Sequence, residues 1–275
     1  MKQKHDTEYY LIPYPKMRRA NTATLRLFQR KPMMHGLLEV DVTQAREFLR
    51  EQKERTGERL SFTAFIIGSV GKAVDEQKAV QAYRQGWRHL LVFHDVDVAT
   101  IIEHEVAGEK VPLLYVIRAV NRKSLREIHT EIRAFQGREP AKSVLGFTAI
   151  PFLPSALLTR VLYRLLRTFP KLHKRVVGTI GVTAVGMFGK GYGWGVPVAA
   201  ASLAITLGGL AAKPGVVDGH IVIRDYLCMT LSFDHRITDG GPAARFANRL
   251  KELIESGYGL DDSTVEAEQS TVSAT

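Results

Sequence analysis

The sequence predicts one domain of mixed α and β structure, and three observations support this prediction. The chain has 275 residues, of which 45% are hydrophobic, so it can bury a substantial core. Strand-like apolar runs alternate along it with stretches of helical periodicity. No repeat of fixed period and no proline-rich linker interrupts this order. One large domain is therefore the simplest organisation.

Strands and helices are expected in alternation over the first half of the chain. The expected strands are 36–43 (GLLEVDVT), two short strands flanking Gln85-Gly86, 94–103 (HDVDVATIIE) and 111–120 (VPLLYVIRAV). Thr43 is expected to cap a helix that runs to about Lys53. A second helix is expected from Ser61 or Thr63 to Asp75, with an apolar stripe formed by Phe65, Ile66, Val70 and Val74.

A third helix should begin after Ser124, where Ser124 and Glu127 have the spacing of a capping box. In this motif the serine oxygen accepts from an early helix N–H, and the glutamate reaches back to the cap. Its apolar face would consist of Leu125, Ile128, Ile132 and Phe135.

The last part of the chain predicts a hairpin followed by a helix. Asp218-Gly219 separates two apolar runs, and this pair readily adopts a two-residue type I′ turn. The strand that follows runs to Phe233, and Pro242 is expected to open a helix at its first position. The stripe of this helix is Phe246, Leu250, Leu253 and Ile254, and Gly257 ends it. His235 therefore lies in a strand-to-helix turn.

Composition limits the classes of partner and compartment. The formal net charge of +10 can attract nucleic acid, anionic lipid or a phosphorylated cofactor, but no nucleic-acid-binding motif accompanies it. Cys228 is the single cysteine, which rules out an internal disulfide framework and suits a cytoplasmic protein. The uncharged run at 196–212 is short for a membrane span, so we expect buried strands there. Residues 260–275 are acidic and are expected to be disordered.

His235 is the leading candidate for catalysis. It lies beside Asp234 and Arg236, and Asp239 follows four residues later. Neighbouring charges can fix the tautomer of a histidine, and a neutral imidazole can act as a general base. Spacing alone does not separate this role from that of a structural histidine. Other histidines, including His94, His104 and His129, have no spacing typical of metal ligands, and no metal site is expected.

Several segments together resemble the acyltransferase component of 2-oxo acid dehydrogenase complexes. The segment 231–246 (LSFDHRITDGGPAARF) resembles its active-site motif, whose core His-x-x-x-Asp-Gly is shared with chloramphenicol acetyltransferase and with condensation domains of peptide synthetases. Further similar segments, in the family's order, are 17–20 (MRRA), 38–43 (LEVDVT), 94–98 (HDVDV), 116–125 (VIRAVNRKSL) and 185–189 (VGMFG). Together they cover about residues 16–257.

The resemblance implies an α+β fold of the chloramphenicol acetyltransferase type: a two-layer sandwich in which helices pack on a mixed sheet, assembled as a trimer. It places the active site in a channel between subunits, where an acyl group moves between coenzyme A and a thiol acceptor such as dihydrolipoyl. His235 would be the base, and the Thr183 hydroxyl would donate to the oxyanion. Asp239 would support the loop, with Arg18 as its ion-pair partner and Gly240 as a supporting residue.

The sequence departs from the family pattern in three places. It contains no segment typical of a lipoyl domain or its linker, so any lipoyl group is expected on another chain. Residues 181–184 (GVTA) stand where the family has Thr-Ile-Ser-Asn. Residues 138–178 form an unusual insert, within the catalytic domain predicted at 1–259, and 154–169 can form a basic amphipathic helix.

Two alternative functions therefore stay open. One is acyl transfer to the hydroxyl or amine of a small molecule, and another is a non-catalytic trimeric scaffold or membrane-surface subunit. The basic insert could lie on an anionic membrane. We favour a helix that covers the channel, because one buried face accounts for most of its leucines. The identity of the acyl group and the residues that bind coenzyme A do not follow from the motifs.

Overall fold

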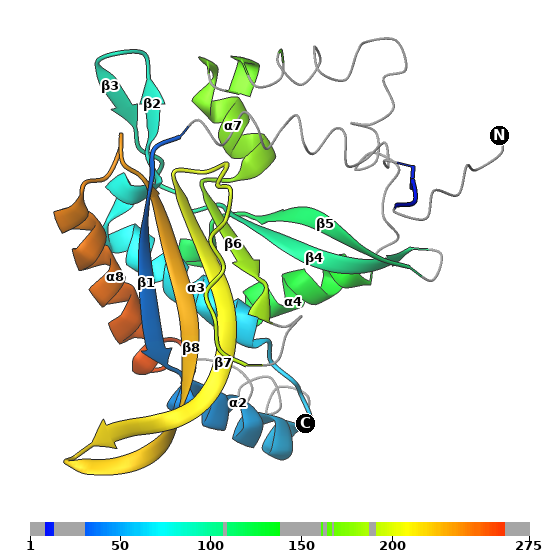
Figure 1. Cartoon of the computed structure of the whole chain (residues 1–275), viewed down its shortest axis with the longest axis vertical. Coiled ribbons are helices and arrows are strands. Elements are labelled where there is room, and N and C mark those ends of the chain that lie inside the picture. Colours follow the sequence, from blue (N-terminus) through cyan, green and yellow to red (C-terminus); the bar gives the residue numbers. More distant parts are fainter. Residues whose placement is uncertain are drawn as a thin grey trace, which may run out of the picture.

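A computed structural model of the chain describes residues 9–13, 31–106, 109–137, 161, 164–166, 168–186 and 191–261. Most of them belong to a six-stranded sheet with helices packed against it (Figure 1). The strands, in spatial order, are β1 (Met33–Asp41), β8 (His220–Asp234), β7 (Leu203–Val217), β6 (Ile180–Ala184), β4 (Val98–Val106) and β5 (Glu109–Ile117).

The sheet is mixed. Strand β6 runs parallel to both β4 and β7, whereas the pairs β1–β8, β7–β8 and β4–β5 are antiparallel. A smaller two-stranded sheet is formed by β2 (Tyr83–Gln85) and β3 (His89–Leu91). The mixed sheet with packed helices confirms the predicted α+β class.

The helices are spread along the whole described chain. They are α2 (Thr43–Thr56), α3 (Phe62–Glu76), α4 (Leu125–Gln136), α7 (Pro170–Val177) and α8 (Gly240–Glu255), with 3-10 turns η1 (Lys78–Gln81) and η2 (Val120–Arg122). Helix α3 contacts both α4 and α8, and α8 also contacts β1. Helix α7 lies apart from these, next to β2 (Figure 1).

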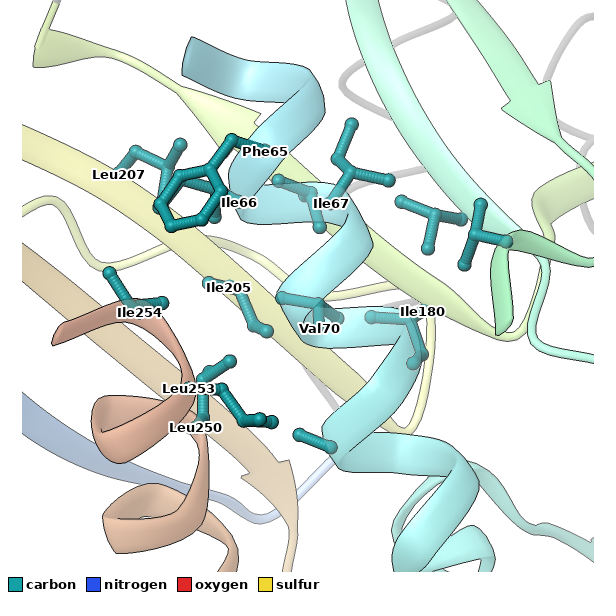
Figure 2. Close-up of a cluster of buried hydrophobic side chains, with 14 of the residues drawn as sticks. Phe65, Ile66, Ile67, Val70, Ile180, Ile205, Leu207, Leu250, Leu253 and Ile254 are labelled. Carbon is teal, nitrogen blue, oxygen red and sulfur yellow. The ribbon is translucent and has the colours of Figure 1, made fainter. Parts of the chain in front are cut away.

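The core lies between α3, α8 and one face of the central strands. Figure 2 shows Ile66 and Val70 of α3, Leu250 of α8 and Ile205 of β7 in this layer. Along β8 the odd-numbered apolar residues from 227 to 233 join the same core. Since strand side chains alternate between faces, the even-numbered residues of β8, which end at Asp234, belong to the opposite face.

Several local predictions are confirmed. The Ser61 hydroxyl accepts from the Ala64 N–H at the start of α3, and Ser124 and Glu127 form both hydrogen bonds of a capping box. Asp218 and Gly219 have φ angles of 51° and 80°, as a type I′ turn requires. The run at 196–212 is only partly the buried strand that we expected: residues 203–212 belong to β7, whereas Val196 and Val198 precede it and are 61% and 43% exposed. Among the described residues, no helix is long and apolar enough to cross a bilayer.

Two helix starts differ from expectation. Val42, not Thr43, is the N-cap of α2, because the Thr43 hydroxyl donates to Oδ1 of Asp41 at 2.6 Å and accepts from the Asp225 N–H. Pro242 is not the first residue of α8, which begins at Gly240 after Asp239. The turn at 235–239 is therefore shorter than predicted.

The insert and the tail are described only in part. Within 138–178, residues 164–166 are helical and α7 follows; most of the predicted helix at 154–169 lies outside the described residues. Leu166 is buried, while Leu165 is 42% exposed. Leu260 is buried in the core, and residues 262–275 lie outside the described part of the chain.

Candidate active site

His235 lies in a tight turn between β8 and α8. Its backbone N–H donates to the carbonyl oxygen of Pro32 at 2.9 Å, and the N–H groups of Ile237 and Thr238 donate to the carbonyl oxygen of Asp234. The Asp234 N–H donates in turn to Ser202 at 2.8 Å. These bonds tie the turn to the entry of β1 and to the entry of β7, so the backbone of His235 is fixed.

The His235 side chain is directed toward solvent, with 52% of it exposed. Its Nδ1 lies 3.4 Å from Oδ1 of Asp239, which is the N-cap residue of α8. This distance is longer than a charged hydrogen bond. A carboxylate near Nδ1 favours the tautomer that carries its proton there, which leaves Nε2 free to accept a proton. The imidazole therefore has the orientation that a general base needs.

Asp234 and Arg236, on either side of His235, form a close ion pair. Arg236 donates from Nε to Oδ1 of Asp234 at 2.8 Å and from Nη2 to Oδ2 at 2.5 Å, and the Arg236 N–H adds a third bond to Oδ1. Burial favours the neutral form of Asp234, but these bonds and the Arg236 charge outweigh it and lower the pKa of the carboxyl. The ion pair stabilises the turn that contains His235.

Thr183 does not lie beside His235 within one chain. It is in register with Thr206 of β7, which is in register with Thr230 of β8, and Thr230 precedes His235 by five residues. Two strand spacings and five residues along a strand separate the two positions by on the order of 15–20 Å. No side chain can bridge that distance, so one chain alone does not bring the two predicted catalytic groups together.

The remaining predicted residues have different outcomes. Gly240 is the first residue of α8 and comes directly after Asp239. Arg18, the expected partner of Asp239, lies outside the described residues. Asp239 is itself 83% exposed.

Sequence reasoning missed a cavity behind the turn. It has a volume of about 380 Å³ and is lined by residues that include Lys31, His173, Asp234 and Arg236. Lys31 precedes the first strand, and His173 belongs to the insert. Nothing in their spacing or local composition links them to residues about 60 to 200 positions away, because only the tertiary fold brings them together.

The fold and the turn together define a class of protein: a mixed α+β domain that carries a half-exposed histidine in a strand-to-helix turn. Comparison with known families gives a more specific result. The model of the family described as 2-oxoacid dehydrogenases acyltransferase (catalytic domain) matches residues 6–144 and 171–260. The chain belongs to this family. The unmatched residues 145–170 fall within the unusual insert.

Curated relatives and solved structures agree with this assignment. The chain is 24% identical over 264 residues, 92% of its length, to a lipoamide acyltransferase component of the branched-chain alpha-keto acid dehydrogenase complex from Bacillus subtilis. It is 27% identical, over 81% of its length, to a dihydrolipoyllysine-residue succinyltransferase component from Bartonella vinsonii. These matches cover 53% and 48% of the two relatives, so the chain spans about half of their length.

The fold is shared with solved structures of similar size. A probable dihydrolipoamide acetyltransferase from Listeria monocytogenes superposes with a TM-score of 0.68 at 23% identity, covering 91% of this chain and 96% of that one. The cubic core of a pyruvate dehydrogenase multienzyme complex superposes with a TM-score of 0.66 at 19% identity, covering 92% and 95%. At these identities the structures establish the fold alone.

Proposed function

We propose that this protein transfers an acyl group between coenzyme A and a thiol acceptor, with His235 as the general base. The observation that carries the proposal is the geometry of the turn. The backbone of His235 is hydrogen-bonded on both sides, while its imidazole is half-exposed and has a carboxylate near Nδ1. Membership of the acyltransferase family supports this use of the histidine.

The proposed reaction uses the unprotonated Nε2 of His235. His235 takes the proton of the acceptor thiol, and the resulting thiolate attacks the carbonyl carbon of the thioester. A new carbon–sulfur bond forms, and the carbonyl oxygen becomes an oxyanion. When the oxyanion collapses, the carbon–sulfur bond to coenzyme A breaks, and the imidazolium returns the proton to the departing sulfur. No covalent acyl-enzyme is needed.

The oxyanion donor in this proposal comes from a second chain. Thr183 has the hydroxyl that the reaction needs, but it is too far from His235 of its own chain. A ring of identical chains would place Thr183 of one subunit at His235 of the next through one repeated, heterologous interface. We therefore include a homotrimer in the proposal.

The end of the β7–β8 hairpin supports such an assembly. This hairpin projects well beyond the rest of the sheet (Figure 1). Val216 is 74% exposed there, and Ile221 and Ile223 are each 79% exposed. Clustered apolar side chains on a projecting element are typical of a surface that another protein chain covers. A second copy of this chain is the occupant that the divided site requires.

The dihydrolipoyl group is the acceptor that we favour. The relatives from Bacillus subtilis and Bartonella vinsonii are a lipoamide acyltransferase and a dihydrolipoyllysine-residue succinyltransferase. A lipoyl group would reach the site on another chain or on a domain outside the described residues. The net charge of +10 would favour binding of the phosphates of coenzyme A.

A direct assay tests the proposed function. Release of free coenzyme A is measured from acetyl-, propionyl- and branched-acyl coenzyme A, with dihydrolipoamide as acceptor and with the acceptor omitted as control. The proposal predicts acceptor-dependent release with at least one donor. Release that requires a hydroxyl or amine acceptor instead would replace the thiol in the proposal. Absence of turnover with every donor and acceptor, from an assembled protein, would contradict it and favour a scaffold.

A further inference from the structure

The cavity behind the catalytic turn has the size of a small-molecule site. Its volume of about 380 Å³ falls within the range typical of ligand pockets. Its walls come from the β2–β3 hairpin, from the insert around α7, and from the turn after β8. Asp234, Arg236 and Ile237 line it, but His235 does not. Strand alternation explains this, since Asp234 and His235 are directed to different sides.

Lys31 supplies a half-buried positive charge to this cavity. Its ammonium donates to the carbonyl oxygens of Ala200 and Ala201, the latter at 3.2 Å. An ammonium has three N–H donors, and these two neutral carbonyls occupy two of them. Desolvation lowers the pKa of Lys31 to about 8, although the nearby Asp234 carboxylate opposes the shift. At neutral pH the side chain remains a cation.

The cations around the cavity exceed the anions among its described lining residues. Asp234 is the carboxylate there, and both its oxygens accept from Arg236. Lys31 and Arg236 therefore share one negative charge, and Arg84 at the rim adds a third cation. Holding a half-buried ammonium that only shares a counterion is costly, and an anion bound beside it would lower that cost.

The rest of the cavity lining is suited to the apolar part of a ligand. Leu166 and Pro170 of the insert are buried, and they line the cavity together with Ile237. Trp87 is 92% exposed at the hairpin, where its ring lies 5.1 Å from the guanidinium carbon of Arg84. His173, which contacts Tyr83 edge-on at 4.6 Å between ring centroids, adds a neutral ring that can exchange a hydrogen bond with a ligand.

We propose that this cavity binds a small organic carboxylate, with the carboxylate on Lys31 and an apolar or aromatic body against Leu166, Pro170 and Ile237. A single negative charge matches the Lys31 ammonium, which has one N–H donor left and shares the Asp234 carboxylate with Arg236, whereas a phosphate would place further charge against apolar walls. The proposal gives the insert a role as one wall of a binding site. It stands independently of the acyl transfer proposed for His235.

Calorimetric titration with sodium benzoate at pH 7 and constant ionic strength tests the proposal. Benzamide, which has nearly the same shape and no charge, is the ligand control. Lys31→Met removes the charged donor, and Lys78→Met, which removes a cation of the surface ion pair with Asp75, is the matched protein control. We expect benzoate to bind at millimolar concentration or below, and Lys31→Met to weaken it about 10- to 100-fold, the range for a hydrogen bond to a charged group.

A second variant keeps the test decisive if Lys31→Met does not fold. Leu166→Trp fills the apolar part of the cavity and leaves every charge in place. We expect it to weaken benzoate binding while Lys78→Met binds as the wild type does. Three results would overturn the proposal: equal binding of benzoate and benzamide, full binding by Lys31→Met, or no binding of benzoate at all. The last is judged at about 50 mM benzoate, well above the millimolar dissociation constant that we expect.

Discussion

The two sides of the turn after β8 differ in how complete they are within one chain. On one side, His235 is half-exposed and its predicted partner Thr183 lies on the order of 15–20 Å away. On the other side, Asp234, Arg236 and Lys31 line a cavity, and the Asp234–Arg236 ion pair that borders it is formed within one chain. Adjacent residues in one turn thus belong to two proposed sites: one that a second chain would complete, and a cavity that one chain builds.

The comparison separates two kinds of evidence of function within one molecule. His235 has a fixed backbone, is open to solvent and lies far from Thr183, which fits the proposed site shared between copies. Lys31 is a half-buried cation with one N–H donor left over, which fits a bound anion. The following predictions test each side separately, beginning with the largest expected effect.

Replacing His235 should abolish most of the activity. His235→Ala removes the proposed base, and we expect a loss of roughly 10²–10⁴-fold in the rate of acyl transfer. The fold should be unchanged, because the bonds that fix the turn use backbone atoms of this residue. His94→Ala, at another exposed histidine, is the control and should retain full activity. A His235→Ala protein with normal activity would refute its role as base.

Replacing Thr183 should give the next largest loss. Thr183→Ala removes the proposed oxyanion donor, and we expect kcat to fall by about 10²–10³-fold with little change in KM. Thr183→Ser retains a hydroxyl and should recover most of the rate. If the serine variant is as slow as the alanine variant, the hydroxyl is not what the reaction uses.

Breaking the ion pair beside the cavity should affect stability. Arg236→Met leaves the buried Asp234 carboxylate without its bidentate partner, and we expect a loss of about 3 kcal/mol in the free energy of unfolding. Arg122→Met, which breaks a surface pair with Asp95, should cost less than about 1 kcal/mol. Urea unfolding measures both. Equal losses would show that Asp234 is not effectively buried.

Acid should destabilise the protein through His173. Burial, together with the charge of Lys31, lowers the pKa of this histidine to about 3, so the folded chain keeps it neutral while the unfolded chain protonates near pH 6.5. Stability is thus lost as the pH falls below 6.5. Relative to the wild type, His173→Gln should lose about 2 kcal/mol less between pH 7 and pH 5. Parallel stability curves for the two proteins would contradict a buried neutral His173.

The fold was largely predictable because its signals are local. The capping box at Ser124, the turn at Asp218-Gly219 and the apolar stripe of α3 each depend on neighbours within one turn of chain. The error at Thr43 arose where a long-range contact competes with a local preference. Thr43 binds Asp225 and Asp41 in place of capping its own helix.

The site was predictable only where a motif carries it. His235, Asp239 and Gly240 lie within six residues of sequence and remain together at the turn. The separation of Thr183 from His235 depends on strand order, which periodicity does not specify. Lys31 and His173 meet only through tertiary packing, so no sequence pattern indicated the cavity.

Mixed assemblies test the central claim most directly. His235→Ala and Thr183→Ala chains are coexpressed in equal amounts, and each is also assembled alone. If His235 of one chain works with Thr183 of its neighbour, random mixing of the two inactive chains should restore about a quarter of the wild-type turnover, since both groups are intact at that fraction of interfaces in a closed ring. Turnover no higher than that of either variant alone would contradict a site divided between subunits.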